Sequence, residues 1–174
     1  PLFGQLLNTV RHSLSLPDLF TSEEAVQYAL LLHVEPRNVL LVGGGIGNSI
    51  SQVLKHPSIQ RVTYVELDPM LFEMGAEYLG ECLHGKDKLT VIFGDARYHV
   101  KNSSMYYDVI IVNLPDPMNA QINRFYTEEF FAEAKRILNP EGVLSVRITA
   151  PPNIISPLFG QLLNTVRHSL SLPD

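Results

Sequence analysis

The chain has 174 residues, 45% of them hydrophobic and 18% charged, a composition that fits one globular domain and excludes a disordered chain. The net charge of −5 argues against a nucleic-acid-binding surface and is compatible with a cationic small-molecule partner. The single cysteine excludes an internal disulfide, the histidines lack metal-ligand spacing and no apolar run could span a membrane, so we expect a metal-free cytoplasmic domain.

The first 18 residues, PLFGQLLNTVRHSLSLPD, recur unchanged at 157–174. Repeat proteins diverge between copies and need several units to bury a core. We therefore interpret the duplication as a feature of how the chain is assembled, and not as a structural repeat. If the fold offers one place for this segment, the other copy is loose, docked elsewhere, or exchanged between two molecules of a homodimer.

The second copy has the better start for a helix. Ser156 can cap the helix, and Pro157 can occupy its first position. Apolar residues then follow at helical spacing: Leu158, Leu162, Leu163, Val166 and Leu170. We therefore expect a C-terminal helix over 157–174.

Strand-like and helix-like segments alternate between the two copies. A capping box at 21–24 precedes a helix expected over 25–33. Further helices are predicted over 49–56, 70–79 and 128–138, the last capped by Thr127, and strands over 38–42, 61–66, 89–93, 108–112 and 143–148, the last after a turn at 139–142. This order predicts a Rossmann-like, methyltransferase-type α/β domain over 19–156, a doubly wound parallel sheet between two helical layers. Ligands of such sheets bind beyond the carboxyl ends of the strands.

A glycine-rich turn joins the first strand to the helix that follows. Gly43, Gly45 and Gly47 allow a sharp turn and the close approach of a ligand to the backbone. Asn48 stands where the dinucleotide fingerprint needs its third glycine. The pattern therefore favours a nucleoside with a thioether or sulfonium tail over a pyrophosphate. A turn that only packs strand against helix is the alternative.

Acidic residues end the second and third strands. Glu66 has two acceptor oxygens, which suit the two hydroxyls of a ribose. Asp95 can accept a hydrogen bond from an adenine amino group, and Ala96 leaves room for the ring. The plainer alternatives are a solvated strand-end acid at position 66 and a turn-forming aspartate at position 95.

The segment Asn113-Leu114-Pro115-Asp116-Pro117 ends the fourth strand. Its two prolines restrict the backbone, so Asp116 is expected to point to where the reacting tail of the ligand lies. Tyr126, which comes just before the Thr127 cap, either lines the same mouth or packs in the core.

Several segments occur in an order that identifies a family. They are RNVLLVGGG at 37–45, LKHP at 54–57, VELD at 65–68, GDAR at 94–97, YDVIIV at 107–112, DP at 116–117 and FYTEEFF at 125–131. This series, which covers roughly residues 18–150, resembles the spermidine synthase (polyamine aminopropyltransferase) family. The resemblance implies decarboxylated S-adenosylmethionine or methylthioadenosine as the ligand, held at the ribose by Glu66 and at the adenine by Asp95. It also implies that Asp116 faces the amine substrate.

Three positions depart from the family pattern. The family has an acid where Ile46 stands, which helps to hold the aminopropyl amine, and another where Asn113 stands, which is the usual candidate base. A tyrosine expected before the first helix is absent. An attacking amine must lose a proton, Asn113 cannot accept it, and a positioned base contributes about 10²–10⁴-fold. The nucleoside half of the site thus matches the family, and the amine half is altered.

Three functions therefore stay open: aminopropyl transfer to an amine, methyl transfer from S-adenosylmethionine, and nucleoside binding without catalysis. The pocket for the tail would discriminate the first two, because S-adenosylmethionine has a carboxylate that its decarboxylated form lacks. Asn-Leu-Pro-Asp-Pro also resembles a subset of the family that is fused behind membrane helices. That resemblance implies a membrane-anchored parent protein with this domain on the cytoplasmic side.

Overall fold

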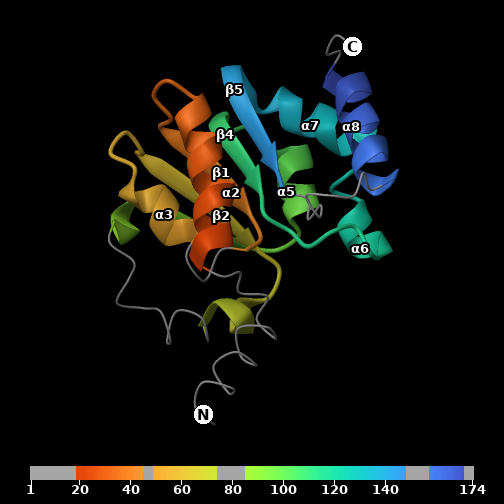
Figure 1. Cartoon of the computed structure of the whole chain (residues 1–174). Helices are drawn as coiled ribbons and strands as arrows, with labels where there is room; N and C mark the ends of the chain where they lie inside the picture. The colour runs from red at the N-terminus through yellow and green to blue at the C-terminus, as the bar shows by residue number, and fades with distance from the viewer. Residues whose placement is uncertain (1–18, 45–48, 74–84, 148–156, 171–174) are drawn as a thin grey trace.

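A computed structural model describes residues 19–44, 49–73, 85–147 and 157–170. Its centre is a parallel sheet with the strand order β3-β2-β1-β4-β5 (Figure 1). The strands are β1 (Asn38–Val42), β2 (Arg61–Glu66), β3 (Leu89–Phe93), β4 (Tyr107–Val112) and β5 (Leu138–Val146). The helices are α2 (Leu19–Leu32), α3 (Ile50–Lys55), α5 (Ala96–Asn102), α6 (Ala120–Asn123), α7 (Glu128–Arg136) and α8 (Pro157–Leu170), with a 3-10 turn, η3 (Lys86–Lys88). The predicted parallel α/β architecture is confirmed.

Helices cover both faces of the sheet (Figure 1). α2 and α3 pack on one face, and α5, α7 and α8 pack on the other. Side chains alternate between the faces along a strand, so Val39 and Leu41 enter the first core and Leu40 and Val42 the second. All four are buried, which explains why this strand is a continuous apolar run and not an alternating one.

The order in which the chain adds strands to the sheet reverses between β1 and β4, although all the strands are parallel. From β1 the chain proceeds outward to β2 and β3, then returns to β4 and β5 on the other side. The ends of the two central strands stay joined, because the Asn113 amide donates to the Val42 carbonyl at 2.9 Å. Such a reversal leaves a crevice beyond the carboxyl ends of the strands.

The first helix differs from its prediction. α2 begins at Leu19 and runs without a break through 21–24, so this stretch is helix and not a capping box. Residues 69–73 are helical, and the rest of the helix predicted over 70–79 lies outside the described residues. Two short helices, α5 and α6, were not predicted. α5 has a local signal, since Asp95 caps it and Ala96 and Val100 bury one face four residues apart.

The turn predicted at 139–142 is an irregular part of β5. Tyr107 pairs with Leu138 and Val109 pairs with Val143, so four residues of β5 oppose one of β4. Glu141 has φ of 65°, a left-handed conformation uncommon outside glycine. The chain thus turns within the strand before the regular pairing resumes.

The segment from 157 forms α8, which packs on α7 through Leu162 and Val166. The identical copy at 1–18 lies outside the described residues, as do 171–174. Within the described ranges no helix is both long and apolar enough to cross a membrane. No group of three or more His, Cys, Asp or Glu side chains there could hold a metal ion.

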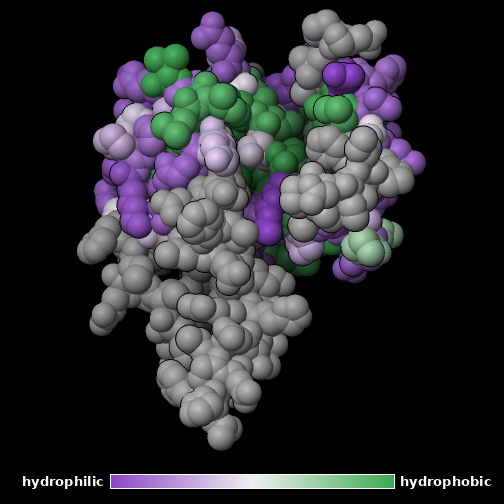
Figure 2. Space-filling view, viewed as in Figure 1, coloured by the Kyte–Doolittle hydropathy of each residue, from purple (hydrophilic) through white to green (hydrophobic). Residues whose placement is uncertain are grey.

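Hydrophobic surface gathers over the upper end of α2 in the space-filling view (Figure 2). Leu31 and Leu32 in the last turn of α2, and Val34 just after it, are exposed, Val34 almost completely (99%). This patch lies near the start of β1, and the described pocket lies beyond the opposite ends of the strands.

Candidate active site

A pocket of about 530 Å³ lies beyond the carboxyl ends of the central strands, within the size range of small-ligand sites. Of the residues predicted for the site, Gly43, Glu66, Asp95 and Ala96 line it. Gly45 and Gly47 lie outside the described residues. The other lining residues are Val42, Val65, Leu67, Gly94, Leu114, Ala120, Gln121, Ile122, Arg124 and Phe125.

The turn after β1 presses against the segment that follows β4. Gly43 and Gly44 both have left-handed φ, 69° and 60°. A Cβ on Gly43 would lie 2.4 Å from a methyl carbon of Leu114, and one on Gly44 would lie 2.4 Å from Nδ2 of Asn113. Both the conformation and the close contacts therefore require glycine. These glycines thus pack against the segment after β4, and Gly43 also contributes to the pocket wall.

Glu66 is held in place at the end of β2. The Tyr64 hydroxyl donates to Oε2, and the Asp68 amide donates to Oε1 at 3.1 Å. Asp68 in turn accepts from the Met70 amide at 2.9 Å, which accounts for it as a helix cap. Each carboxylate oxygen can accept more than one hydrogen bond, so the fixed Glu66 retains acceptor capacity for a ligand.

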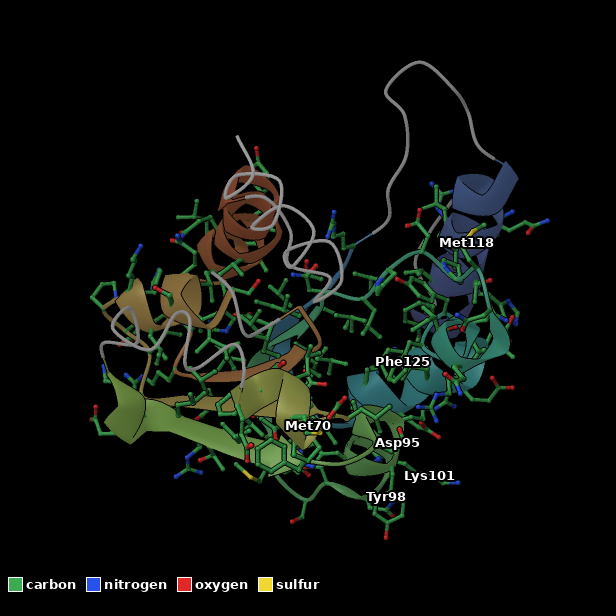
Figure 3. All side chains as sticks on the ribbon, turned by 90° about the horizontal axis from the view of Figure 1, so that it is seen from below. Met70, Asp95, Tyr98, Lys101, Met118 and Phe125 are labelled. Carbon is green, nitrogen blue, oxygen red and sulfur yellow. The ribbon has the colours of Figure 1, made fainter. Side chains whose placement is uncertain are left out.

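Asp95 caps α5 and also faces the pocket. Its Oδ1 accepts from the amides of Arg97 and Tyr98 at 2.8 and 3.4 Å, and its Oδ2 accepts from Arg124 Nη1 at 2.6 Å. Burial acts to raise the pKa of Asp95, but these hydrogen bonds and the Arg124 charge outweigh it and hold the pKa below its ordinary value. Asp95 and Phe125, which both line the pocket, are labelled in Figure 3.

Arg124 is a pocket residue that the sequence analysis missed. Besides its ion pair with Asp95, its Nε donates to the Gln121 carbonyl at 2.9 Å, and its guanidinium lies 5.1 Å from the centre of the Phe125 ring. It follows α6, a helix of only four residues whose one local signal is the Asn119 cap. Because α6 was not predicted, no feature of the sequence indicated that the segment after it lies over the pocket.

Asn113 is buried and is not among the residues that line the pocket. Its Nδ2 donates to Ser49 Oγ at 3.1 Å, and its Oδ1 accepts from Arg147 Nη1 at 3.4 Å. One amide thus joins the end of β4 to the start of α3 and the end of β5.

Tyr126 is also buried and absent from the pocket lining. Its hydroxyl lies 3.1 Å from the Pro115 carbonyl and 3.2 Å from the Arg147 carbonyl. Burial and the charge of Asp116 raise the pKa of Tyr126 to about 12, against the effect of Arg147. The phenol therefore stays protonated near neutral pH, and it holds the half-buried segment that contains Asp116.

Sequence comparisons place the chain among known proteins. The family model described as spermine/spermidine synthase domain matches residues 19–171. The chain is 40% identical over 134 residues to polyamine aminopropyltransferase of Oceanobacillus iheyensis, covering 74% of this chain and 26% of that protein. It is 38% identical over 149 residues to polyamine aminopropyltransferase 2 of Hyperthermus butylicus, covering 83% of this chain and 48% of that protein. The chain thus spans about a quarter to a half of these relatives.

Solved structures share the fold. A spermidine synthase in complex with the transition state analogue AdoDATO gives a TM-score of 0.78 at 26% identity, covering 87% of this chain and 52% of that one. Human methyltransferase-like protein 13 in complex with SAH gives a TM-score of 0.54 at 18% identity, covering 88% of this chain and 91% of that one. The second likeness is one of fold alone.

Proposed function

The chain belongs to the spermine/spermidine synthase domain family, and on that premise we propose that its pocket binds decarboxylated S-adenosylmethionine, or its product methylthioadenosine, in a protein that transfers the aminopropyl group to a small amine. The main support is the placement of two fixed carboxylates around one pocket. Glu66 and Asp95 end neighbouring strands, and the Gly94 amide donates to the Glu66 carbonyl at 2.8 Å. A nucleoside offers donors at both ends, the ribose hydroxyls and the adenine amino group.

The two carboxylates would divide the nucleoside between them. In this proposal Glu66 accepts hydrogen bonds from the ribose hydroxyls, and Asp95 accepts one from the adenine amino group, with Ala96 beside the ring. The left-handed turn at Gly43, with Gly45 and Gly47 after it, allows the sulfonium tail to approach the backbone.

The chemical step needs a group that accepts a proton. The nitrogen of the acceptor amine attacks the propyl carbon attached to sulfur, the carbon–sulfur bond breaks, and its electron pair stays on sulfur as the neutral thioether of methylthioadenosine. Because the acceptor amine is protonated near neutral pH, its nitrogen must lose a proton before it attacks, and we propose that Asp116 accepts that proton. Asn113 cannot take that proton. Tyr126, whose pKa is raised to about 12, contributes by holding in place the segment that contains Asp116.

A calorimetric titration with methylthioadenosine, S-adenosylmethionine and decarboxylated S-adenosylmethionine tests this proposal. We expect the decarboxylated form to bind more tightly than S-adenosylmethionine. Glu66→Ala should weaken methylthioadenosine binding about 10- to 100-fold, the effect of losing hydrogen bonds to a charged acceptor. Glu35→Ala is the matched control, because Glu35 is an exposed acid paired with Arg37 outside the pocket. Unchanged affinity in Glu66→Ala would contradict the ribose assignment.

Methyl transfer is the second candidate, and Arg147 favours it. Its guanidinium lies 3.4 Å from Oδ1 of Asn113, at the carboxyl ends of β4 and β5. A cation there suits the carboxylate of S-adenosylmethionine, which the decarboxylated form lacks. Tighter binding of S-adenosylmethionine in the same titration, lost in Arg147→Met, would support methyl transfer.

A further inference from the structure

An ion pair forms part of the pocket wall. Arg124 Nη1 lies 2.6 Å from Asp95 Oδ2, and both residues line the pocket. The pair joins the start of α5 to the segment after α6, two parts of the chain that are distant in sequence. The side chains are 38% and 36% exposed, so a ligand entering the pocket would remove water from both.

Three N–H donors fix the carboxylate of Asp95. Two backbone amides hold Oδ1, and Arg124 holds Oδ2. Arg124 is itself anchored, by the Gln121 carbonyl and by the Phe125 ring beneath its guanidinium. The orientation of the Asp95 carboxylate therefore depends on Arg124, since no other side chain of the described residues is bonded to Oδ2.

We propose that Arg124 is a positioning residue that keeps Asp95 ionised and oriented, so that the pocket accepts a 6-aminopurine and rejects a 6-oxopurine. This inference rests on the nucleoside site of the proposed function. An ionised carboxylate only accepts hydrogen bonds, so it suits an amino group and repels a carbonyl oxygen.

Removal of Arg124 would change what Asp95 can do. A base entering the pocket would then bury a carboxylate with one oxygen unpaired, and desolvation favours its protonated form. A protonated carboxyl group can donate as well as accept, so it tolerates a carbonyl at position 6. The preference between the two bases would fall, mainly through weaker binding of the aminopurine.

The experiment compares methylthioadenosine with 5′-methylthioinosine by calorimetry on the full chain. In the parent protein we expect about 10- to 100-fold tighter binding of methylthioadenosine, the range for a hydrogen bond to a charged group. Arg124→Met should reduce this ratio to about threefold or less. Arg124→Lys, which keeps a charged donor, should retain most of it. Arg124→Gln serves as a second neutral variant if Arg124→Met does not fold.

Arg136→Met is the matched control. Arg136 braces the opposite end of α5 through the carbonyls of Val100, Lys101 and Ser103, at 2.8–3.1 Å, and does not line the pocket. Arg136→Met should lower the stability of the protein and leave the ratio of the two nucleoside affinities unchanged. An unchanged affinity ratio in both neutral variants at position 124 would overturn this inference and leave the proposed function standing. An affinity ratio lowered as far by Arg136→Met would do the same. A parent protein that binds neither nucleoside would overturn the proposed function together with it.

Discussion

The hydroxyl of Tyr126 joins two segments that the sequence separates widely. It has one proton and two carbonyl neighbours, those of Pro115 and Arg147, so it connects the segment after β4 to the end of β5. The ring is part of the core on the α7 face, so only the hydroxyl distinguishes it from a phenylalanine in packing. The hydroxyl can therefore be tested separately from the ring.

We predict that Tyr126→Phe lowers the free energy of unfolding by about 1 kcal/mol at neutral pH, the usual loss for one buried hydrogen bond. The pKa of Tyr126 is raised from about 10 in the unfolded chain to about 12 in the fold, so folding favours the protonated phenol. The stabilising contribution is complete below pH 10 and declines as the pH rises from about 10 to 12. Urea unfolding of parent and variant between pH 8 and pH 11 measures the difference. A stability difference that stays constant over this range would contradict the assignment.

Among the helices, α7 shows how local chemistry defines an element. Thr127 accepts from the Phe130 amide at 3.4 Å, and Glu128 and Glu129 occupy the first turn. Lys135 and Arg136 occupy the last turn, so the charges at both ends complement the helix dipole.

Replacement of the cap should be measurable. Thr127→Ala is expected to lower the free energy of unfolding by about 0.5–2 kcal/mol, whereas Thr127→Ser, which keeps the hydroxyl, should lose much less. Thermal or urea unfolding of the two variants checks this. Equal losses in both would show that the methyl group matters and not the hydroxyl.

The elements that were predicted correctly have signals within their own sequence. The Thr127 cap and the apolar spacing after it identify α7, and a continuous apolar run identifies β1. α5 was missed because Asp95, its cap, was interpreted as an acid that binds the ligand or, alternatively, as a turn-forming aspartate. The structure shows that Asp95 caps the helix and lines the pocket. The predicted start of α2 was wrong, because the residues at 21–24 that could form a capping box are also compatible with the interior of a helix. Local patterns specify an element better than its ends.

At the scale of the whole molecule, the two ends of the sheet differ in what they do. At the end opposite the pocket, Asp108 accepts from the amides of Arg37 and Asn38, both at 2.8 Å, and from Asn139 Nδ2 at 2.6 Å. One carboxylate thus joins the starts of β1 and β4 to the irregular part of β5. Burial acts to raise the pKa of Asp108, but these hydrogen bonds outweigh it and lower the pKa.

We predict that Asp108→Asn reduces stability and leaves nucleoside binding unchanged. Because the folded pKa is depressed, the contribution of Asp108 is complete above the unfolded pKa of about 4 and is lost as the pH falls through the folded value. The stability difference between parent and variant should therefore shrink below about pH 4 in acid unfolding experiments. Altered affinity for methylthioadenosine in Asp108→Asn would show that the two ends of the sheet are coupled.

The pocket itself was predictable only in part. Gly43, Glu66, Asp95 and Ala96 lie at or just after the carboxyl ends of parallel strands, so topology alone brings them to one edge. Arg124 arrives from a segment that returns over the pocket after a four-residue helix, a path with no periodic signal. The burial of Asn113 and Tyr126 also depends on contacts between distant segments, which a single sequence does not display.

The contact between Arg147 and Asn113 limits how a base could be introduced at position 113 by design. Asn113→Asp has the same shape and fits beside Gly44, and Ser49 can turn its hydroxyl to donate to the new carboxylate. The guanidinium 3.4 Å away would then form an ion pair and lower the pKa of the new aspartate, which makes it a weak proton acceptor. The order of substitutions therefore matters: the charge of Arg147 has to be removed before an acid at position 113 can act as a base.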